Sequence, residues 1–267
     1  MIKGIILDLD GTVYLGDAEV PGAGKFARDM KAGGVHCLYV TNRANRSAEE
    51  VCAQLKRYGI ACDAGDVLTS AQATVQYLKK GTVFYIGEQS FGKLLEDNGF
   101  KVSEDSPDYV IISFDRRVTK EKISKAAGLI KRGAKFIATN PDKALKIEGG
   151  VMPGTGAIVE AVAKEAGVQP AVMIGKPEKL IIEMGIKMLG LKKNEVILVG
   201  DNVETDIPAG AKAGIRTALI LTGISSRNDV HGMAVQPTWV VESFEELEDI
   251  VKADRPGKRS RQNRLSV

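Results

Sequence analysis

Short apolar runs alternate along the chain with stretches whose apolar residues recur at three- and four-residue spacing. Runs rich in β-branched residues are typical of buried strands, and the longer spacing is typical of amphipathic helices. The pattern predicts strands near residues 5–7, 35–40, 67–69, 83–86, 109–112, 135–138, 172–174, 196–199 and 217–221. It predicts helices at residues 48–58, 120–131, 157–166 and 179–189. This alternation indicates an α/β fold with a mainly parallel sheet.

The number and placement of these strands predict more than one structural unit. Eight or more strands exceed what one compact sheet usually holds, and the acidic motifs described below lie near the two ends of the chain. We therefore expect residues 1–79 and 172–251 to form one domain, with residues 80–171 inserted as a second α/β unit that can hinge. Residues 252–267 lack apolar periodicity, which predicts a disordered basic tail.

Two carboxylates mark the end of the first predicted strand. The apolar residues 5–7 lead directly into Asp8, Leu9, Asp10 and Gly11. In open parallel sheets the ligand crevice lies beyond the carboxyl ends of such strands, and alternation would send Asp8 and Asp10 to the same side. Two anions this close need a cation or a shared proton, which favours a divalent metal. The alternative is a pair of turn-forming aspartates that cap the next element.

A second acidic cluster follows another apolar strand, at residues 196–199. Gly200 permits a tight turn there, Asp201 would project at the strand end, and Asp206 would begin a helix. If the two strands are neighbours, several carboxylates converge, and hard oxygen ligands of this kind favour Mg²⁺ over zinc. Taken singly, Asp201 could instead be a turn residue and Asp206 a helix cap.

Two further strand ends carry polar residues suited to an anion. Thr41 and Asn42 follow an apolar strand and offer a hydroxyl and backbone N–H groups. Lys176 follows the strand predicted at residues 172–174 and precedes Pro177. Its side chain would point inward from this strand end. A lone lysine is more often a solvated surface charge, but its neighbours here favour a role in the site.

Charge and hydropathy narrow the class of protein. The net charge of +3 arises in the tail, where residues 252–267 hold six basic residues and one acidic residue. The rest of the chain is slightly acidic, so it gives no reason to expect nucleic-acid binding. No segment approaches the roughly 18 apolar residues of a membrane span, and the start does not resemble a secretory signal. We expect a cytoplasmic protein.

Cysteine and histidine content excludes other chemistries. Cys37, Cys52 and Cys62 form no closely spaced pair and are odd in number, which argues against a disulfide framework or a zinc site. A reducing cytoplasm is consistent with this. The two histidines, His36 and His231, are interpreted as structural or surface residues, so a His-based reaction is not expected.

The ordered set of motifs resembles the four motifs of the haloacid dehalogenase superfamily, and further segments are similar to its class IIA, NagD-like branch of 4-nitrophenylphosphatases and related phosphatases. The superfamily motifs are Asp8-Leu9-Asp10-Gly11-Thr12, Thr41-Asn42, Lys176 before Pro177, and Gly200-Asp201 to Asp206. The branch segments include Pro21-Gly22, Thr139-Asn140-Pro141-Asp142, Pro153-Gly154 and Leu221-Thr222-Gly223. The resemblance implies a Rossmannoid core with an α/β cap inserted between the second and third motifs.

The resemblance also implies roles for individual residues. Asp8 would be the nucleophile that forms an aspartyl-phosphate, and Asp10 the acid that protonates the leaving oxygen and later deprotonates water. Mg²⁺ would be held by the Asp8 carboxylate, the Asp10 main-chain carbonyl and Asp201, with Asp206 beside them. The phosphate oxygens would be held by Thr41, by the backbone near Asn42 and Arg43, and by Lys176.

The chain departs from the branch in two places. Relatives often have Thr-Asn-Asn-Ser where this chain has Arg43 and Ala44 after Thr41 and Asn42, and Lys146 replaces a frequent proline in the inserted unit. Both changes would affect which leaving group is accepted, although Arg43 could also be a solvated residue at a helix start. The resemblance suggests that the turn holding Asn140 and Asp142 faces the site and contacts substrate.

The function expected is Mg²⁺-dependent hydrolysis of a small phosphomonoester of the nucleotide, phosphoglycolate, pyridoxal phosphate or sugar phosphate type. The alternatives are a phosphomutase of the same superfamily and a catalytically silent binding module. A dehalogenase is disfavoured because halide departure does not need the acid that Asp10 supplies. The expected partner is a small phosphorylated metabolite, without nucleic acid or membrane, and a homo-oligomer stays open.

Overall fold

The computed structural model describes residues 1–147 and 150–254, with side chains for all of these except residues 146 and 147. A six-stranded sheet has the order β15-β14-β13-β1-β4-β5, and every neighbouring pair is parallel. Its strands are β1 (Gly4–Leu7), β4 (His36–Thr41), β5 (Val67–Thr69), β13 (Val196–Gly200), β14 (Arg216–Ile220) and β15 (Trp239–Val241). The α/β class with a mainly parallel sheet is therefore confirmed.

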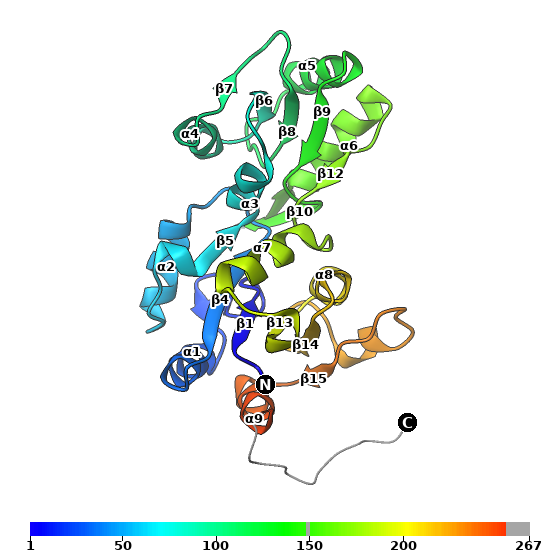
Figure 1. Ribbon diagram of the computed structural model, residues 1–267. Helices are drawn as coiled ribbons and strands as arrows, with labels where there is room; N and C mark the ends of the chain where they lie inside the picture. Colours follow the sequence, from blue (N-terminus) through cyan, green and yellow to red (C-terminus); the bar gives the residue numbers. More distant parts are fainter. Residues whose placement is uncertain (148–149, 255–267) are drawn as a thin grey trace.

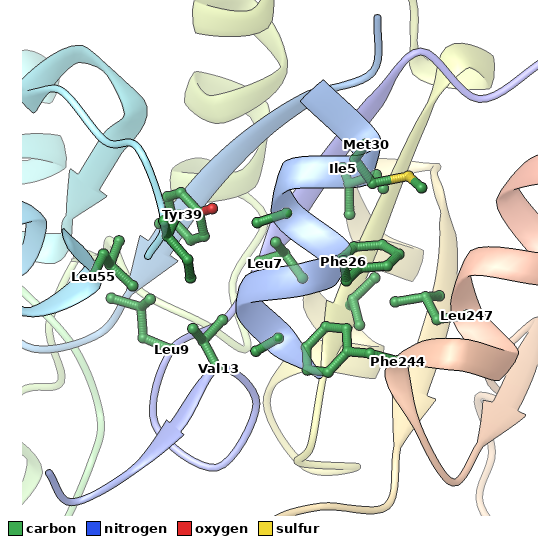
Figure 2. Packing of buried hydrophobic residues seen from close by; sticks show 14 of the residues in the cluster. Ile5, Leu7, Leu9, Val13, Phe26, Met30, Tyr39, Leu55, Phe244 and Leu247 are labelled. Atoms are coloured by element: carbon green, nitrogen blue, oxygen red, sulfur yellow. The ribbon is translucent and has the colours of Figure 1, made fainter. Parts of the chain in front are cut away.

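Helices cover both faces of this first sheet (Figure 1). They are α1 (Ala23–Ala32), α2 (Ala48–Arg57), α3 (Ser70–Tyr77), α7 (Leu180–Leu189), α8 (Asp206–Ala213) and α9 (Phe244–Ala253). Side chains alternate along β1, so Ile5 and Leu7 join the apolar cluster of α1, α2 and α9, whereas Ile6 joins that of α3, α7 and α8. Figure 2 shows the first cluster. Within it, the ring centroids of Phe26 and Phe244 are 5.1 Å apart.

The second sheet is formed by the middle of the chain and has the order β12-β9-β8-β6-β7, again with parallel pairs. Its strands are β6 (Thr82–Ile86), β7 (Lys101–Val102), β8 (Tyr109–Ile112), β9 (Lys135–Ala138) and β12 (Val172–Met173). Its helices are α4 (Gln89–Asp97), α5 (Lys120–Lys131) and α6 (Thr155–Ala166). Figure 1 shows this unit beyond the carboxyl ends of the first sheet.

Two short hairpins complete the described strands. They are β2 (Tyr14–Leu15) with β3 (Ala18–Glu19), and β10 (Ala144–Ile147) with β11 (Gly150–Pro153), both antiparallel. Single 3₁₀ turns precede β5 and β13 and follow β14, at Ala64–Asp66, Lys193–Glu195 and Arg227–Val230. Among the described residues, no helix is long and apolar enough to cross a membrane.

The domain limits stay a prediction. The pairing of one strand, β12, does not follow the predicted limit at residue 172. β12 lies in the range expected for the domain that resumes at residue 172, yet it pairs with β9 in the second sheet. At the other end, Lys252 and Ala253 fall within the expected disordered tail, but they form the last turn of α9, which is anchored by the buried Leu247 and Val251. The remaining tail, residues 255–267, lies outside the described residues.

The argument against a disulfide is wrong. Cys52 in α2 and Cys62 in the segment after it form a disulfide, with Cα atoms 5.2 Å apart and a sequence separation of 10. After α2 the backbone reverses at Gly59, whose φ of 70° is in the left-handed region, and the chain returns along the helix. The reversal brings together two cysteines whose spacing gave no signal, and Cys37 is left as a free thiol.

Candidate active site

The carboxyl ends of three adjacent parallel strands define the site. β1 lies between β13 and β4, so the residues that follow these strands converge at one edge of the sheet. Asp8 follows β1, Asn42 follows β4, and Asp201 follows β13. Lys176 reaches the same edge from the segment between β12 and α7. The topology thus brings together motifs that are up to about 190 residues apart in the sequence.

A buried ion-pair network forms the centre of the site. The Lys176 ammonium contacts the Asp8 carboxylate and donates to Asp206 Oδ1 at 2.7 Å. All three residues are buried: Lys176 is 2% exposed, Asp8 7% and Asp206 1%. Because a buried charge is costly unless it is paired, the Lys176 ammonium is fixed by the two carboxylates on either side of it.

Asp201 is held beside this network by hydrogen bonds from one backbone N–H group and one hydroxyl group. Its Oδ2 accepts the Ile224 N–H at 2.7 Å, and its Oδ1 accepts the Thr12 hydroxyl at 3.4 Å. Space for its carboxylate depends on glycine, because a Cβ at Gly11 would lie 2.2 Å from Asp201 Oδ2 and one at Gly223 would lie 2.0 Å from it. Gly11 of the first motif therefore leaves the space that the Asp201 carboxylate of the last motif occupies.

The donor set fits a divalent cation. Asp8, Asp201 and Asp206 each offer a carboxylate oxygen, and these atoms lie within 4.8 Å of one another. Three carboxylates face the single positive charge of Lys176, which leaves an excess of negative charge in a buried space. Carboxylate oxygens without thiol or imidazole are the ligands that Mg²⁺ prefers.

The pKa values of the site report this crowding. Burial raises the pKa of Asp8 well above its usual value, Lys176 opposes the rise, and the Asp206 and Asp201 charges add to it. Burial followed by the Asp206 charge raises the pKa of Asp201 to about 6. Burial lowers the pKa of Lys176, but Asp206 and Asp8 outweigh it, so the net shift is upward. Both aspartates would gain from a cation, which stabilises their ionised form.

The Asn42 side chain is not a free ligand, because it forms hydrogen bonds to Lys176 and Asp142. These contacts are called the Asn42 brace below. Its Nδ2 donates to the Lys176 carbonyl at 2.9 Å and to Asp142 Oδ1 at 3.0 Å, and its Oδ1 accepts the Lys176 N–H at 2.9 Å. The neighbouring Thr41 hydroxyl accepts the Arg43 N–H at 3.0 Å. The backbone near Asn42 is the part expected to bind phosphate, and the Asn42 side chain instead holds the backbone of Lys176. Sequence spacing gave no signal for this link.

Asp10 lies at the mouth of the site and is paired with Arg43. The Arg43 Nε and Nη2 donate to the two Asp10 oxygens, each at 2.8 Å. Both side chains are partly exposed, unlike the central network. The sequence marks Arg43 as a departure from the branch but does not indicate its partner, because the pair joins the end of β1 to the loop after β4.

The turn after β9 meets the first sheet through Asn140 and Asp142. Asn140 Nδ2 donates to the Asn42 carbonyl at 2.8 Å, and its Oδ1 accepts the Asp142 N–H at 3.1 Å. Burial raises the pKa of Asp142, opposed by its bond from Asn42. Asn42, Arg43, Asn140 and Asp142 line a cavity of about 20 Å³. Lys146 lies in β10, and its side chain is outside the described part.

Comparison with known proteins identifies the family. A model described as haloacid dehalogenase-like hydrolase matches residues 5–101, and one described as HAD-hydrolase-like matches residues 173–247. The chain is 37% identical over 248 residues to the 5'-nucleotidase YutF of Bacillus subtilis, with 91% of this chain and 96% of that protein covered. The chain belongs to the haloacid dehalogenase-like hydrolases.

Two further likenesses confirm the branch suggested by the motifs. The chain is 39% identical over 247 residues to the acid sugar phosphatase of Staphylococcus epidermidis, covering 91% of this chain and 94% of that protein. The structure of NagD from Escherichia coli K-12 superposes with a TM-score of 0.87 at 32% identity, covering 92% of this chain and 98% of that one. This haloacid dehalogenase-like hydrolase is therefore a phosphatase of the NagD-like branch, with the Rossmannoid core and cap of that fold.

Proposed function

We propose that this phosphatase hydrolyses a small phosphomonoester with Mg²⁺ through an aspartyl-phosphate on Asp8. The observation that carries the proposal is the placement of Asp8. It is buried at the central strand end, paired with Lys176 and flanked by Asp201 and Asp206. A carboxylate in this setting is fixed in position by the Lys176 ammonium, and a bound cation would offset the excess negative charge, as attack on an anionic phosphate requires.

The proposed reaction has two displacements. An Asp8 oxygen attacks phosphorus, the bond from phosphorus to the ester oxygen breaks, and Asp10 gives that oxygen its proton. A water molecule then attacks phosphorus and gives a proton to Asp10, which releases inorganic phosphate and restores the Asp8 carboxylate. Because the first step leaves Asp10 ionised, one carboxyl group serves as acid and then as base.

The remaining residues would bind the cation and the phosphate. Mg²⁺ would be held by the Asp8 carboxylate, the Asp10 main-chain carbonyl and Asp201, with Asp206 beside them. When bound, it neutralises charge and lets one anion approach another. Asn42 holds the Lys176 backbone, and Asp206 holds its ammonium. This ammonium would bind non-bridging phosphate oxygens together with Thr41 and the adjacent backbone.

The proposed substrates are small phosphate esters of the nucleotide, phosphoglycolate, pyridoxal phosphate or sugar phosphate type. The relatives are named as a 5'-nucleotidase and an acid sugar phosphatase, which supports this range. The turn with Asn140 and Asp142 would contact the leaving group, since these residues meet the first sheet beside Asn42. A small phosphorylated metabolite is thus the proposed partner.

An assay of phosphate release from 4-nitrophenyl phosphate tests the proposal. Activity is expected with Mg²⁺, with suppression by a chelator and recovery on adding Mg²⁺ back. Asp8→Asn is expected to abolish turnover, whereas Asp17→Asn, which changes a carboxylate with 95% side-chain exposure, should leave it unchanged. Full activity in metal-free protein, or in Asp8→Asn, would contradict the proposed site. Turnover only with a bisphosphate primer would favour a phosphomutase.

A further inference from the structure

The Arg43 guanidinium donates hydrogen bonds to both oxygens of the Asp10 carboxylate, an arrangement called the Arg43 fork below. The two contacts run from Nε and Nη2 of one guanidinium to Oδ2 and Oδ1 of one carboxylate, each at 2.8 Å. A fork of this kind fixes the distance and also the plane of the carboxylate, which a single hydrogen bond or an ammonium group does not.

Among the side chains that the structure describes, Arg43 is the only one that forms a hydrogen bond or ion pair with the Asp10 carboxylate. The Asp10 side chain is 36% exposed, compared with 10% for that of Asp8. A partly exposed carboxylate without a partner would populate several rotamers, and ordering it costs entropy. The orientation of Asp10 therefore depends on Arg43.

Arg43 is itself well placed for this task. Its backbone N–H is held by the Thr41 hydroxyl at 3.0 Å, and its side chain is 23% exposed. It lines the small cavity between the loop after β4 and the turn after β9. Arg43 thus follows the end of β4 directly after Thr41 and Asn42, and its backbone is anchored there by the Thr41 hydroxyl.

We propose that Arg43 is a positioning residue that orients Asp10 as the acceptor for the hydrolytic water, an inference that rests on the function proposed above. In this step the water oxygen bonds to phosphorus, the bond from phosphorus to the Asp8 oxygen breaks, and one water proton moves to Asp10. A carboxylate that accepts two guanidinium N–H groups is oriented as an acceptor, and its remaining lone pairs can face the water. Arg43 therefore acts mainly on the second displacement.

The inference predicts a specific kinetic signature for Arg43→Gln with 4-nitrophenyl phosphate. This leaving group departs with little help from an acid, so loss of Arg43 should leave the first displacement almost unchanged. The value of kcat should fall about tenfold or more, while kcat/KM, which reports the steps through the first displacement, should stay within about twofold. The fraction of enzyme trapped as phosphoenzyme by acid quenching at saturating substrate should rise.

Matched variants separate this role from a structural one. Arg57→Gln changes an exposed arginine whose carboxylate partner lies 3.8 Å away, and it should leave all three quantities unchanged. Arg43→Lys keeps the charge but loses the fork, so its kcat should fall between those of the parent and Arg43→Gln. Thermal unfolding and circular dichroism check that each variant is folded.

A double-mutant cycle tests whether Arg43 acts through Asp10. Because the guanidinium has no carboxylate to orient in Asp10→Asn, adding Arg43→Gln to it should cost less than about twofold more in kcat. Independent, multiplicative losses would overturn the inference. So would a fall in kcat/KM without phosphoenzyme accumulation, which indicates that Arg43 binds substrate directly, or an Arg43→Lys variant equal to the parent.

The same experiment distinguishes failure of the inference from failure of the proposed function. If the parent enzyme forms a phosphoenzyme and Arg43→Gln does not increase it, only the role of Arg43 is wrong. If neither the parent nor Asp10→Asn, in which the second displacement is slowed, yields any phosphoenzyme under conditions that trap a known aspartyl-phosphate, the two-step mechanism is wrong and the inference is overturned with it.

Discussion

At the scale of single residues, the site separates two kinds of carboxylate. Asp8 and Asp206 are buried against Lys176, where their charges are paired and their positions fixed. Asp10 is partly exposed and depends on the Arg43 fork for its orientation. A buried, fixed group suits a nucleophile, whereas a group at the mouth can exchange protons with water and the leaving oxygen. Environment thus assigns different tasks to two aspartates that are only two positions apart.

The role of Asp10 as acid predicts a dependence on the leaving group. Asp10→Asn should lose about 10²–10⁴-fold in kcat/KM for an alkyl phosphate, the usual share of a general acid or base. The loss in kcat/KM should be much smaller for 4-nitrophenyl phosphate, whose leaving oxygen needs little protonation. Steady-state kinetics on the two esters measure this difference. Equal losses in kcat/KM on both would show that Asp10 is not the acid of the first displacement.

In the absence of metal, the ionised Asp201 carboxylate is expected to lower the free energy of unfolding. Burial, followed by the Asp206 charge, raises the pKa of Asp201 to about 6, above the value of an unfolded aspartate. The folded state then binds more protons than the unfolded state between these two values, so its stability falls as pH rises through about 4 to 6. Above this range the full cost remains, because the buried carboxylate is ionised.

Asp201→Asn should therefore stabilise the metal-free protein at pH 7.5, by about 1–3 kcal/mol, and by much less at pH 4.5. Thermal or urea unfolding in a chelator measures this gain, with Asp17→Asn as the exposed control. Added Mg²⁺ should raise the melting temperature of the parent protein but not that of Asp201→Asn. A variant less stable than the parent at pH 7.5 would contradict the sign of this effect.

At the scale of elements, the buried central strands are readable from the sequence, whereas the edge strands β7 and β15 were not predicted and side-chain partnerships are not readable. β8 and β9 match the predicted residues 109–112 and 135–138, because each is an apolar run buried in the sheet. The position of polar residues at the carboxyl ends of such runs is enough to single out Asp8, Lys176 and Asp201. The Arg43 and Asp10 pair, the Asn42 brace and the Cys52 to Cys62 disulfide each join different segments, so no local spacing encodes them.

The turn after β9 should govern the choice of substrate more than the chemistry. Asp142 lines the cavity beside Arg43 and accepts from Asn42, yet it makes no hydrogen bond to Asp8 or Lys176 side chains in the described part of the chain. Asp142→Ala should change the ranking among natural phosphate esters while altering turnover of 4-nitrophenyl phosphate by less than roughly tenfold, about 1.4 kcal/mol. Lys146→Ala in β10 is expected to behave in the same way.

A panel of nucleotide, sugar and carboxylate-bearing phosphate esters, ranked by kcat/KM, measures this effect, with exposed Asp17→Asn as the control. An equal loss on every substrate would place Asp142 in the catalytic machinery or in closure of the cap. A ranking identical to that of the parent would remove the turn from the substrate site.

At the scale of the whole molecule, the two sheets and the chain ends have different relations to the site. The second sheet meets the first at the carboxyl edge through Asn140 and Asp142. The last described residue, Asp254, lies at the opposite edge, where it pairs with Arg216 at the start of β14 and with the amino group of Met1. The described part of the chain therefore ends on the side away from the site.

Removal of residues 255–267 should consequently leave phosphatase kinetics unchanged. The expected values of kcat and KM for 4-nitrophenyl phosphate lie within about twofold of the parent, since none of the site's described contacts involves that edge. Salt-sensitive DNA binding that disappears on the same truncation would instead favour the binding-module alternative for the tail. A large loss of kcat on truncation would contradict the assignment of catalysis to the described residues.

The most direct test of the central claim is chemical identification of the phosphorylated residue. Protein quenched during turnover is reduced with borohydride, which converts an aspartyl-phosphate to homoserine, and the peptide that contains residues 4–12 is analysed by mass spectrometry. The account predicts homoserine at position 8, dependent on both substrate and Mg²⁺ and absent from Asp8→Asn. Turnover with Asp8 unmodified even in Asp10→Asn, in which the second displacement is slowed, or a modification at another residue that persists in Asp8→Asn, would contradict it.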